Sequence, residues 1–486
     1  MPKNNLLFIM SDEHNKFVTG AYGNKLVKTP NLDALSARGI KFTNAYTNCP
    51  ICVPARATIA TGLYPHNIRS WDNSFPFVGG YKSWGHVARE NGVKVTTIGK
   101  LHYRSAVDDV GFDDQRIPMH IKKKTGDLYS LIREEMQPRI NAVKKISDAG
   151  PGETQYTRYD EAISELSKRW LMEEAQLYDQ PWALFVSFIT PHFPLKAPDP
   201  FYKLYSDEEM LLPIAYKKSD RPDHPVIKEM MKAFAITDEL DEPTVRKAIH
   251  AYYSLVSFMD FQVGKVINAL HSSGYADNTR VIYTSDHGDT LGEHGLWWKH
   301  TMYEGSAAVP LFISGPGIES NKVVETPVSH VDLFPTILET FGISMSNLGR
   351  DYPGTSLTKL SKIQPMTDRT VFGEYHAAGS VTGFFLIRNN RYKYVYYVGF
   401  EPQLFDLTSD PHELNDLSKL AEYKNTLMDF ENILRTFVDP EKINEEAKKD
   451  QAKKIKENGG RERILKKGYD VVFTPAPEEF RNDTED

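Results

Sequence analysis

Short apolar runs, bounded by turn residues and separated by helical patterns, recur along this 486-residue chain from Asn5 to about Phe341. Four of them read as buried strands: Asn5–Ser11, Val93–Ile98, Trp182–Ile189 and Arg280–Thr284. Strands that alternate with helical patterns are typical of an α/β fold with a largely parallel sheet. We therefore predict a large, mostly parallel sheet flanked by helices.

Each of these four strands is followed at once by ionisable side chains. The residues concerned are Asp12 and Glu13, Lys100 and His102, His192, and Asp286 and His287. In open α/β sheets, ligands bind beyond the carboxyl ends of the strands. Four strands that all place ionisable groups past the same edge therefore predict an active site there.

The pattern changes after about Lys362. Val371–Tyr375, Phe384–Arg388 and Tyr392–Val398 read as strands joined by short turns, which predicts a small antiparallel sheet. A charged helix, Glu441–Asn458, follows. We divide the chain into a catalytic α/β domain (1–365), a small α+β subdomain (366–440) and a charged helix with an arm (441–486). The arm is expected either to be a solvated helix with a loose end or to reach over a neighbouring copy in a homo-oligomer.

One long helical pattern, Val245–His271, carries aromatic residues that we expect to lie in the core: Tyr252, Tyr253, Phe258 and Phe261.

Charge and cysteine content exclude several classes of protein. The chain has 58 Lys and Arg against 65 Asp and Glu, a net charge of −7, and no basic block in its body, which argues against nucleic acid or an anionic membrane as a partner. Two cysteines provide no disulfide framework. The apolar run Leu6–Met10 is too short for a signal sequence or a membrane span. We expect a cytoplasmic enzyme.

The most specific motif is Cys52-Val53-Pro54-Ala55-Arg56, followed by Thr61-Gly62. It resembles the maturation signature of the type I, formylglycine-dependent sulfatases of the alkaline phosphatase superfamily. The resemblance implies that a maturation enzyme oxidises Cys52 to Cα-formylglycine, whose hydrate is the nucleophile. A geminal diol can attack sulfur with one oxygen and later expel sulfate by collapsing on the other.

Cys49 and Cys52 also form a C-x-x-C pair, which allows a redox or metal reading. A zinc site of thiolates is excluded because the chain has no second cysteine pair. The redox reading leaves Pro54, Arg56 and Thr61-Gly62 without a role. A non-catalytic redox or binding protein is therefore the distant alternative, and Cys49 is expected to be a buried structural thiol.

Asp12, Glu13, Asp286 and His287 offer hard oxygen ligands and one imidazole, a set that suits Ca²⁺, Mg²⁺ or Mn²⁺. The resemblance implies that these positions hold one divalent ion, usually Ca²⁺, which also orients an oxygen of the group derived from Cys52. The family more often has Asp, Asn or Gln at position 13, which leaves open whether Glu13 binds the ion directly. It often has Asn at position 287, and His287 makes Mn²⁺ an alternative.

Three further segments resemble the residues that surround sulfate in the family. Gly99-Lys100-Leu101-His102 resembles G-K-x-H, Thr190-Pro191-His192 resembles a second histidine segment, and Lys299 begins a K-x-x-x-Y-E-G motif. The resemblance implies that Lys100 and Lys299 bind sulfate and that His102 lies near the second hydroxyl of the nucleophile. It places His192 beside the leaving oxygen.

Arg56, in the first turn of a helix expected from about Ala55 to Thr61, can hold the nucleophile or the metal ligands. Asn73 and Trp298 are predicted to contact the substrate, and the wider candidates for lining the pocket are Trp71, Asp72, Trp297 and His376.

The resemblance extends from Asn5 to about Leu417 and is nearest to the bacterial choline-sulfatase-like and arylsulfatase branch. The segment from Ser285 to Lys299 and the run Gln403–Leu407 carry that similarity, whereas 117–176 and the chain after Asp439 do not look like choline sulfatase. We predict hydrolysis of a sulfate monoester of a small organic alcohol or phenol. The alternative is a phosphonate monoester or phosphodiester hydrolase, which shares the nucleophile and metal site.

Overall fold

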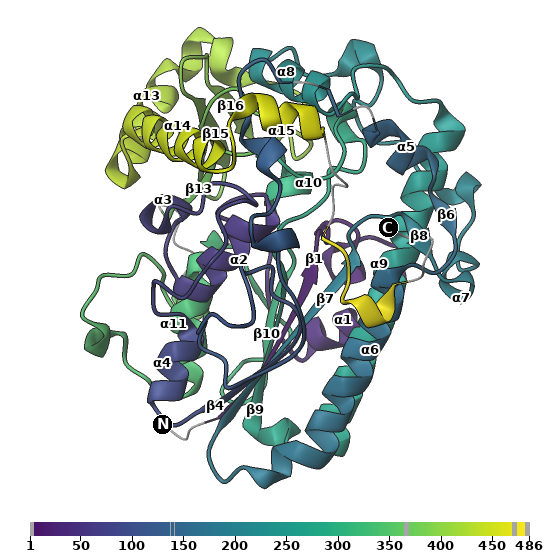
Figure 1. Ribbon diagram of the computed structural model, residues 1–486, viewed down its shortest axis with the longest axis vertical. Helices are drawn as coiled ribbons and strands as arrows, with labels where there is room; N and C mark the ends of the chain where they lie inside the picture. The colour runs from purple at the N-terminus through teal and green to yellow at the C-terminus, as the bar shows by residue number, and fades with distance from the viewer. Residues whose placement is uncertain (1–3, 137, 140, 364–368, 469–473, 482–486) are drawn as a thin grey trace.

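An eight-stranded sheet forms the centre of the molecule and has helices on both faces (Figure 1). The computed structural model describes residues 4–136, 138–139, 141–363, 369–468 and 474–481. In spatial order the strands are β11 (Lys322–Val324), β2 (Gly39–Phe42), β10 (Leu311–Ser314), β9 (Thr279–Ser285), β1 (Asn5–Asp12), β7 (Trp182–Pro191), β4 (Lys94–Lys100) and β5 (Asp114–Met119).

The strands that carry the predicted site residues lie side by side and run in the same direction. β1 pairs in parallel with β9 on one side and with β7 on the other, and β7 pairs in parallel with β4. Only β10 runs antiparallel to its neighbours within the described sheet. The register aligns Ser11 with Ser285 and Asp12 with Pro191, so these strands end at one edge. The predicted sheet is confirmed.

Alternate residues of β1 belong to two separate hydrophobic clusters because successive side chains of a strand point to opposite faces. Leu7 and Ile9 pack with residues of α1 (Pro30–Ala37), α6 (Gln155–Arg169) and α9 (Glu242–Ser272). Leu6, Phe8 and Met10 pack with α2 (Cys52–Thr61), α4 (Trp84–Glu90) and α11 (Leu333–Thr340). Figure 1 shows these two helical layers on either side of the sheet. Both faces are therefore covered, and the strands read as continuous apolar runs.

A second, four-stranded antiparallel sheet confirms the small antiparallel sheet predicted after about Lys362. It consists of β13 (Val371–Tyr375), β14 (Phe384–Arg388), β15 (Tyr392–Tyr397) and β16 (Gln403–Asp406). Three C-terminal helices follow, α13 (Lys424–Phe437), α14 (Pro440–Glu457) and α15 (Arg461–Lys467). The predicted domain boundary at 365/366 lies outside the described residues.

The remaining elements are short and lie in the connections. The strands β12 (Val328–Ser329) and β3 (Ala45–Tyr46) form one two-stranded sheet, and β6 (Gly150–Pro151) and β8 (Lys196–Ala197) form another. The other α-helices are α3 (Pro65–Ile68), α5 (Ala142–Ser147), α7 (Asp199–Tyr202), α8 (Pro225–Ala233), α10 (Glu304–Ala307) and α12 (Leu357–Leu360).

Two expectations require correction. Phe261 is 49% exposed on α9, so it is not a core residue, whereas Tyr252 and Phe258 are fully buried. The helix after the cysteine motif begins at Cys52 itself rather than at Ala55.

The C-terminal tail does not hang loose in its described part. Residues 474–481 return to the carboxyl edge of the sheet and lie against α6 (Figure 1). Tyr156 donates a hydrogen bond to the carbonyl of Thr474 at 2.6 Å, the backbone N–H of Ala476 donates to Gln155, and Arg158 donates to the carbonyl of Phe480. The tail is therefore part of the wall of the site on its own chain.

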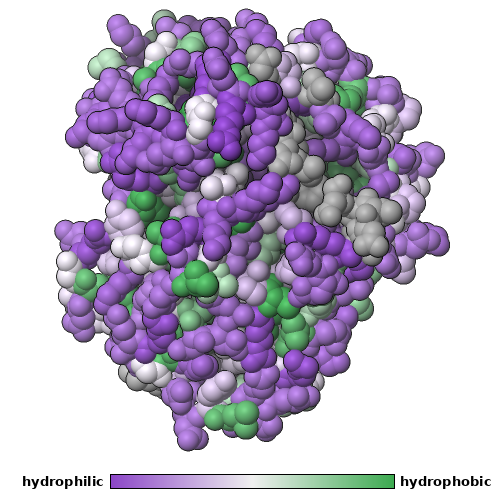
Figure 2. Space-filling view, in the orientation of Figure 1, coloured by the Kyte–Doolittle hydropathy of each residue, from purple (hydrophilic) through white to green (hydrophobic). Residues whose placement is uncertain are grey.

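On the face of the molecule in Figure 2, hydrophilic residues predominate and hydrophobic ones are scattered. In the described part of the chain, no helix is both long and apolar enough to cross a membrane.

Candidate active site

Arg56 joins the ends of the two central strands. Its Nε donates to Asp286 Oδ2 at 2.7 Å, and a terminal nitrogen donates to Asp12 Oδ2 at 2.9 Å. Its other terminal nitrogen binds the Ser187 hydroxyl and the carbonyl of Lys100. All these groups are buried, so the guanidinium offsets two desolvated carboxylates that would otherwise be very costly to bury. Arg56 therefore fixes the geometry of the acidic pair.

Cys52 occupies the first position of α2, after Ile51 in an extended conformation. Its Sγ lies 3.2 Å from Nε2 of His287 and 3.7 Å from Oδ1 of Asp12. Burial and the charge of Asp12 raise the pKa of the thiol to about 12. The side chain is therefore a weak nucleophile as long as it remains a cysteine.

The Thr61-Gly62 part of the motif has a structural role. Gly62 ends α2 in the left-handed conformation (φ 67°), and a Cβ there would come within 2.6 Å of the Phe334 side chain on α11. Glycine is thus needed both for the backbone and for the close approach of α11.

Four side chains at this edge are arranged as a metal site would require. Ligand atoms of Asp12, Cys52, Asp286 and His287 lie within 4.8 Å of one another. Nδ1 of His287 is 3.0 Å from the carbonyl of Gly288, which can only accept, so the lone pair is on Nε2, the atom that faces the other ligands. This donor set fits a divalent ion that prefers oxygen and tolerates one imidazole.

Glu13 faces a second set of groups. Its Oε2 accepts a hydrogen bond from Lys299 Nζ at 2.9 Å and lies 3.3 Å from His192 Nε2. Its Oε1 is buried and has no hydrogen-bond partner among the described residues. Burial raises the pKa of Glu13 to about 7 even though Lys299 opposes the shift. Glu13, Asp12 and His192 form a second group that could hold a metal ion.

Two lysines lie on either side of the acidic edge. Lys100 Nζ is 2.7 Å from Asp12 Oδ2, and Lys299 Nζ contacts Glu13. Burial opposes ionisation of Asp12, but Lys100 and Arg56 outweigh it and hold the pKa of that carboxyl well below its usual range. Burial also works against the charge of Lys299, but Cys52 and Glu13 keep its pKa above the usual value. Both lysines are therefore positioned as cations beside Cys52.

His102 is held by the C-terminal tail. Its Nε2 lies 2.7 Å from the hydroxyl of Thr474, and its Nδ1 is buried without a partner among the described residues. Burial and the charge of Lys100 hold the pKa of His102 well below its usual range, which favours the neutral imidazole. A neutral imidazole with one free nitrogen can accept a proton.

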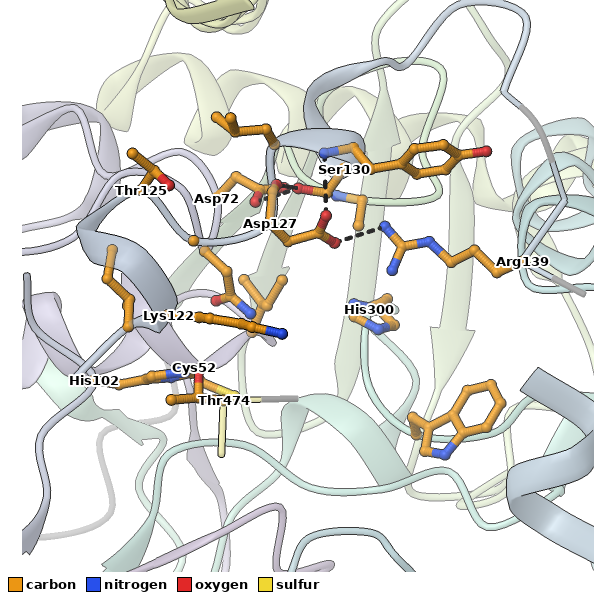
Figure 3. A pocket seen from close by; sticks show the side chains of 18 of the residues that line it. Cys52, Asp72, His102, Lys122, Thr125, Asp127, Ser130, Arg139, His300 and Thr474 are labelled. Atoms are coloured by element: carbon orange, nitrogen blue, oxygen red, sulfur yellow. Dashed lines mark hydrogen bonds and ion pairs between the residues drawn. The ribbon is translucent and has the colours of Figure 1, made fainter. Parts of the chain in front are cut away.

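A cavity of about 370 Å³ opens in front of these groups (Figure 3). Its wall includes the predicted residues Cys52, Asn73, Lys100, His102, His192, Trp298 and Lys299. The side-chain oxygen of Asn73 accepts a hydrogen bond from the Val53 N–H at 3.0 Å, so this residue also steadies the start of α2.

Three of the wider candidates lie elsewhere. Trp71 donates to Asp450 at 2.8 Å, His376 lies 3.1 Å from Glu374, and Trp297 lines a separate small cavity.

Several residues of the cavity wall were not predicted from the sequence. They are Lys122, Arg139, Lys145, Tyr156, His300 and Thr474, among others. The run Lys122-Lys123-Lys124 was a local signal of positive charge, but nothing in the sequence connects Thr474 with His102.

Comparisons with known proteins identify the family of this chain. A model of the sulfatase family matches residues 4–343, and a model of the C-terminal region of N-sulphoglucosamine sulphohydrolase matches residues 292–439. The chain is 33% identical to a choline-sulfatase of Rhizobium meliloti (strain 1021) over 427 residues, 86% of this chain and 83% of that protein. It is 30% identical to arylsulfatase K of Bos taurus over 462 residues, 90% and 82% of the two chains.

The crystal structure of a phosphonate monoester hydrolase of Agrobacterium radiobacter is also similar. Its TM-score is 0.71 at 25% sequence identity, with 89% of this chain and 95% of that chain covered. Because the sulfatase model covers most of the chain and both relatives named as sulfatases align along most of their lengths, this protein belongs to the sulfatase family and is a sulfuric ester hydrolase.

Proposed function

We propose that this protein hydrolyses a sulfate monoester of a small organic alcohol or phenol, with a formylglycine derived from Cys52 and one divalent metal ion. The observation that carries the proposal is the position of Cys52. Its Sγ lies at the start of a buried helix, against His287 and Asp12, and faces a cavity that also contains Lys100 and Lys299.

The metal ion would be held by Asp12, Asp286 and His287, with the group at position 52 completing the set. When bound, the ion would supply positive charge that makes it easier to deprotonate the attacking hydroxyl and that stabilises the negative charge of the sulfate group. Ca²⁺ is the ion we propose, with Mn²⁺ or Mg²⁺ as alternatives. Glu13, which contacts Lys299 and His192, is proposed to support these groups or to join the ligands when sulfate is absent.

Separate residues are proposed to carry out the separate parts of ester hydrolysis. A formylglycine hydrate supplies two hydroxyl oxygens, one to attack sulfur and one whose deprotonation expels sulfate. Lys100 and Lys299 neutralise the sulfate oxygens, and Arg56 keeps Asp12 and Asp286 in place.

Two histidines are proposed to move protons. His192, or Lys299 beside it, protonates the leaving oxygen, because an alkoxide is a poor leaving group without a proton. The neutral His102 takes a proton from the second hydroxyl at its Nδ1, which has no hydrogen-bond partner among the described residues.

The proposal is tested by intact mass and by two cysteine variants. A formylglycine residue is about 18 Da lighter than cysteine, whereas a disulfide removes about 2 Da. Cys52→Ala should lose all turnover of an aryl sulfate while its melting temperature is retained. Cys49→Ala, the matched control, should keep most activity because Cys49 is a buried thiol outside the cavity wall. Equal loss in both variants would favour the redox reading.

A phosphonate monoester or phosphodiester hydrolase is the second candidate, favoured by the similarity to the Agrobacterium radiobacter enzyme. Sulfate, phosphonate and phosphodiester esters of one phenol separate the two candidates. A higher kcat/KM on either phosphorus ester than on the sulfate would reverse our order.

We further propose that a formylglycine-generating enzyme matures this protein. We also propose that the mature protein acts in the cytoplasm without nucleic acid or membrane partners. Its two cysteines are both free, as expected in a reducing compartment. A homo-oligomer through the C-terminal arm also stays a prediction. Cell fractionation tests the cytoplasmic location, and the molar mass in solution tests the homo-oligomer.

A further inference from the structure

His300 lines the active-site cavity but has no part in the proposed proton transfers or in sulfate binding. It follows Lys299 in the chain and is only 8% exposed, and Figure 3 shows its imidazole at the wall of the cavity. Its backbone N–H donates a hydrogen bond to the carbonyl of Pro50, two residues before Cys52, at 3.1 Å. The backbone of His300 is therefore tied to the segment that carries the nucleophile.

The small C-terminal sheet fixes which ring nitrogen of His300 carries the proton. The hydroxyl of Tyr375, the last residue of β13, lies 2.9 Å from Nδ1 of His300 and donates its own hydrogen bond to the carbonyl of Ala378 at 2.7 Å. Because the hydroxyl proton of Tyr375 is used in that bond, the phenol oxygen accepts from Nδ1, which must carry the ring proton. The lone pair of the neutral imidazole then lies on Nε2.

Nε2 of His300 is a hydrogen-bond acceptor that the protein leaves open to the cavity. It has no hydrogen-bond partner in the described part of the chain. Unlike Nδ1 of His102, it is not completely enclosed by protein atoms. Burial and the charge of Lys299 hold the pKa of His300 well below its usual range, which keeps the imidazole neutral. A ligand in the cavity can therefore donate a hydrogen bond to Nε2.

The ring of His300 is also held in this orientation from a third segment. It stacks on the ring of Phe234, at the end of α8, with a centroid distance of 4.7 Å and an interplanar angle of 12°. The backbone at His300 has a φ of 87°, in the left-handed region that glycine adopts at lower cost. A side chain that is kept in such a conformation and fixed by contacts with separate segments is typical of a group with a function in a binding site.

We propose that His300 determines substrate specificity by accepting, at Nε2, a hydrogen bond from a second, unsulfated hydroxyl group on the alcohol part of the substrate. The inference rests on the proposed sulfatase function and narrows its substrate class to monosulfates of diols and other polyhydroxy compounds, dihydroxybenzenes included. An ammonium group could also donate to Nε2, but it would lie near the like charge of Lys299. A substrate without a donor would leave the buried Nε2 unsatisfied, which costs affinity.

The test uses pairs of sulfate esters that differ in one hydrogen-bond donor. The monosulfates of catechol, resorcinol and hydroquinone are each compared with the sulfate of the corresponding monomethyl ether, which keeps the oxygen but cannot donate. The two phenols of a pair have similar leaving ability, and the three ring positions place the hydroxyl at three distances from the ester. Ethylene glycol monosulfate and its methyl ether form a fourth, alkyl pair. With the mature enzyme, confirmed by mass, kcat/KM should be about tenfold higher for the hydroxyl compound than for its ether in at least one pair.

The variants assign the preference to a side chain. His300→Phe keeps a ring that can stack on Phe234 but has no acceptor, so the hydroxyl-to-ether ratio of kcat/KM should fall to about one. His300→Gln keeps an acceptor and should retain part of the ratio. Tyr375→Phe removes the oxygen that fixes the proton on Nδ1 and should lower the ratio several-fold. His224→Phe is the matched control, because His224 is also 8% exposed and packs on the Tyr397 ring but does not line the cavity. Melting temperatures verify that each variant is folded.

Each outcome has a defined meaning. Equal kcat/KM within every hydroxyl and ether pair overturns the inference but leaves the sulfatase function standing. A preference that persists unchanged in His300→Phe, or that is lost to the same extent in His224→Phe, overturns the assignment to His300. If the mature enzyme hydrolyses no sulfate ester at all, the proposed function fails and the inference fails with it.

Discussion

The contact between Thr474 and His102 provides the sharpest test of the role of the tail. Thr474→Val keeps the shape of the side chain but removes the hydroxyl that lies 2.7 Å from Nε2 of His102. In the native state Nε2–H can donate to this oxygen, which leaves the lone pair on Nδ1, the nitrogen that has no hydrogen-bond partner among the described residues. Without the hydroxyl, neither ring nitrogen of the buried His102 imidazole has a hydrogen-bond partner in the part of the chain that the structure describes, and the tautomer is no longer fixed.

The expected size follows from the cost of an unsatisfied buried polar group, about 1–3 kcal/mol. If that cost falls on the step that needs His102, the rate of the step drops by roughly 5-fold to 150-fold. His102 is assigned to the expulsion of sulfate, which comes after the phenol has left. The loss should therefore appear in kcat, with a much smaller change in kcat/KM.

Stopped-flow measurement of nitrophenol release from nitrophenyl sulfate distinguishes this effect from general damage. Thr474→Val should show a burst of about one phenol per active site followed by slow turnover, because the first step stays fast. Thr474→Ser keeps the hydroxyl and should behave like the wild type. A proportional fall in kcat and kcat/KM without a burst would reduce Thr474 to a packing residue, and unchanged kinetics would refute the contact altogether.

Three further predictions concern other parts of the site. His192→Ala should slow hydrolysis of alkyl sulfates by about two to four orders of magnitude and that of nitrophenyl sulfate far less, because only a poor leaving group needs the proton; parallel plots of log rate against leaving-group pKa would transfer the acid role to Lys299. Chelation should inactivate the enzyme, and Asp286→Asn should weaken metal binding measured by calorimetry because it removes one of the two carboxylates held by Arg56; full activity after verified metal removal would exclude the metal. Asp160→Ala should lower the free energy of unfolding, measured by urea titration, by roughly 2–5 kcal/mol, because Asp160 accepts hydrogen bonds from the backbone N–H groups of Ile189 and Thr190, both at 2.8 Å. A loss below about 0.5 kcal/mol, the usual range for a surface change, would show that water replaces the carboxylate.

Local patterns in the sequence determined the sheet and the site residues that follow its strands. Apolar runs such as Asn5–Ser11 and Trp182–Ile189 have no polar face, which is the signature of strands covered on both sides, and the structure has them at the centre of the sheet. Because parallel strands end at one edge, Asp12, Lys100 and Asp286 had to lie close together once the topology was known. The motif at Cys52 could be recognised from the sequence because all its parts lie within one short stretch of chain.

Tertiary structure alone decided the features that depend on contacts between distant segments. The exposure of Phe261 was not foreseen, because helical spacing shows which residues share a face but not how far the neighbouring elements cover it. The arm was expected to have a loose end or to reach over a neighbour. In its described part it is not loose, because Thr474 lies on His102, 372 positions away along the chain, while contact with a neighbouring copy stays a prediction. The cavity wall likewise brings residues 122–145 together with α15, which the sequence separates by more than 300 positions. Such contacts leave no periodic or local signal, because the free energy that forms them comes from packing and charge between elements whose placement the chain sequence does not reveal on its own.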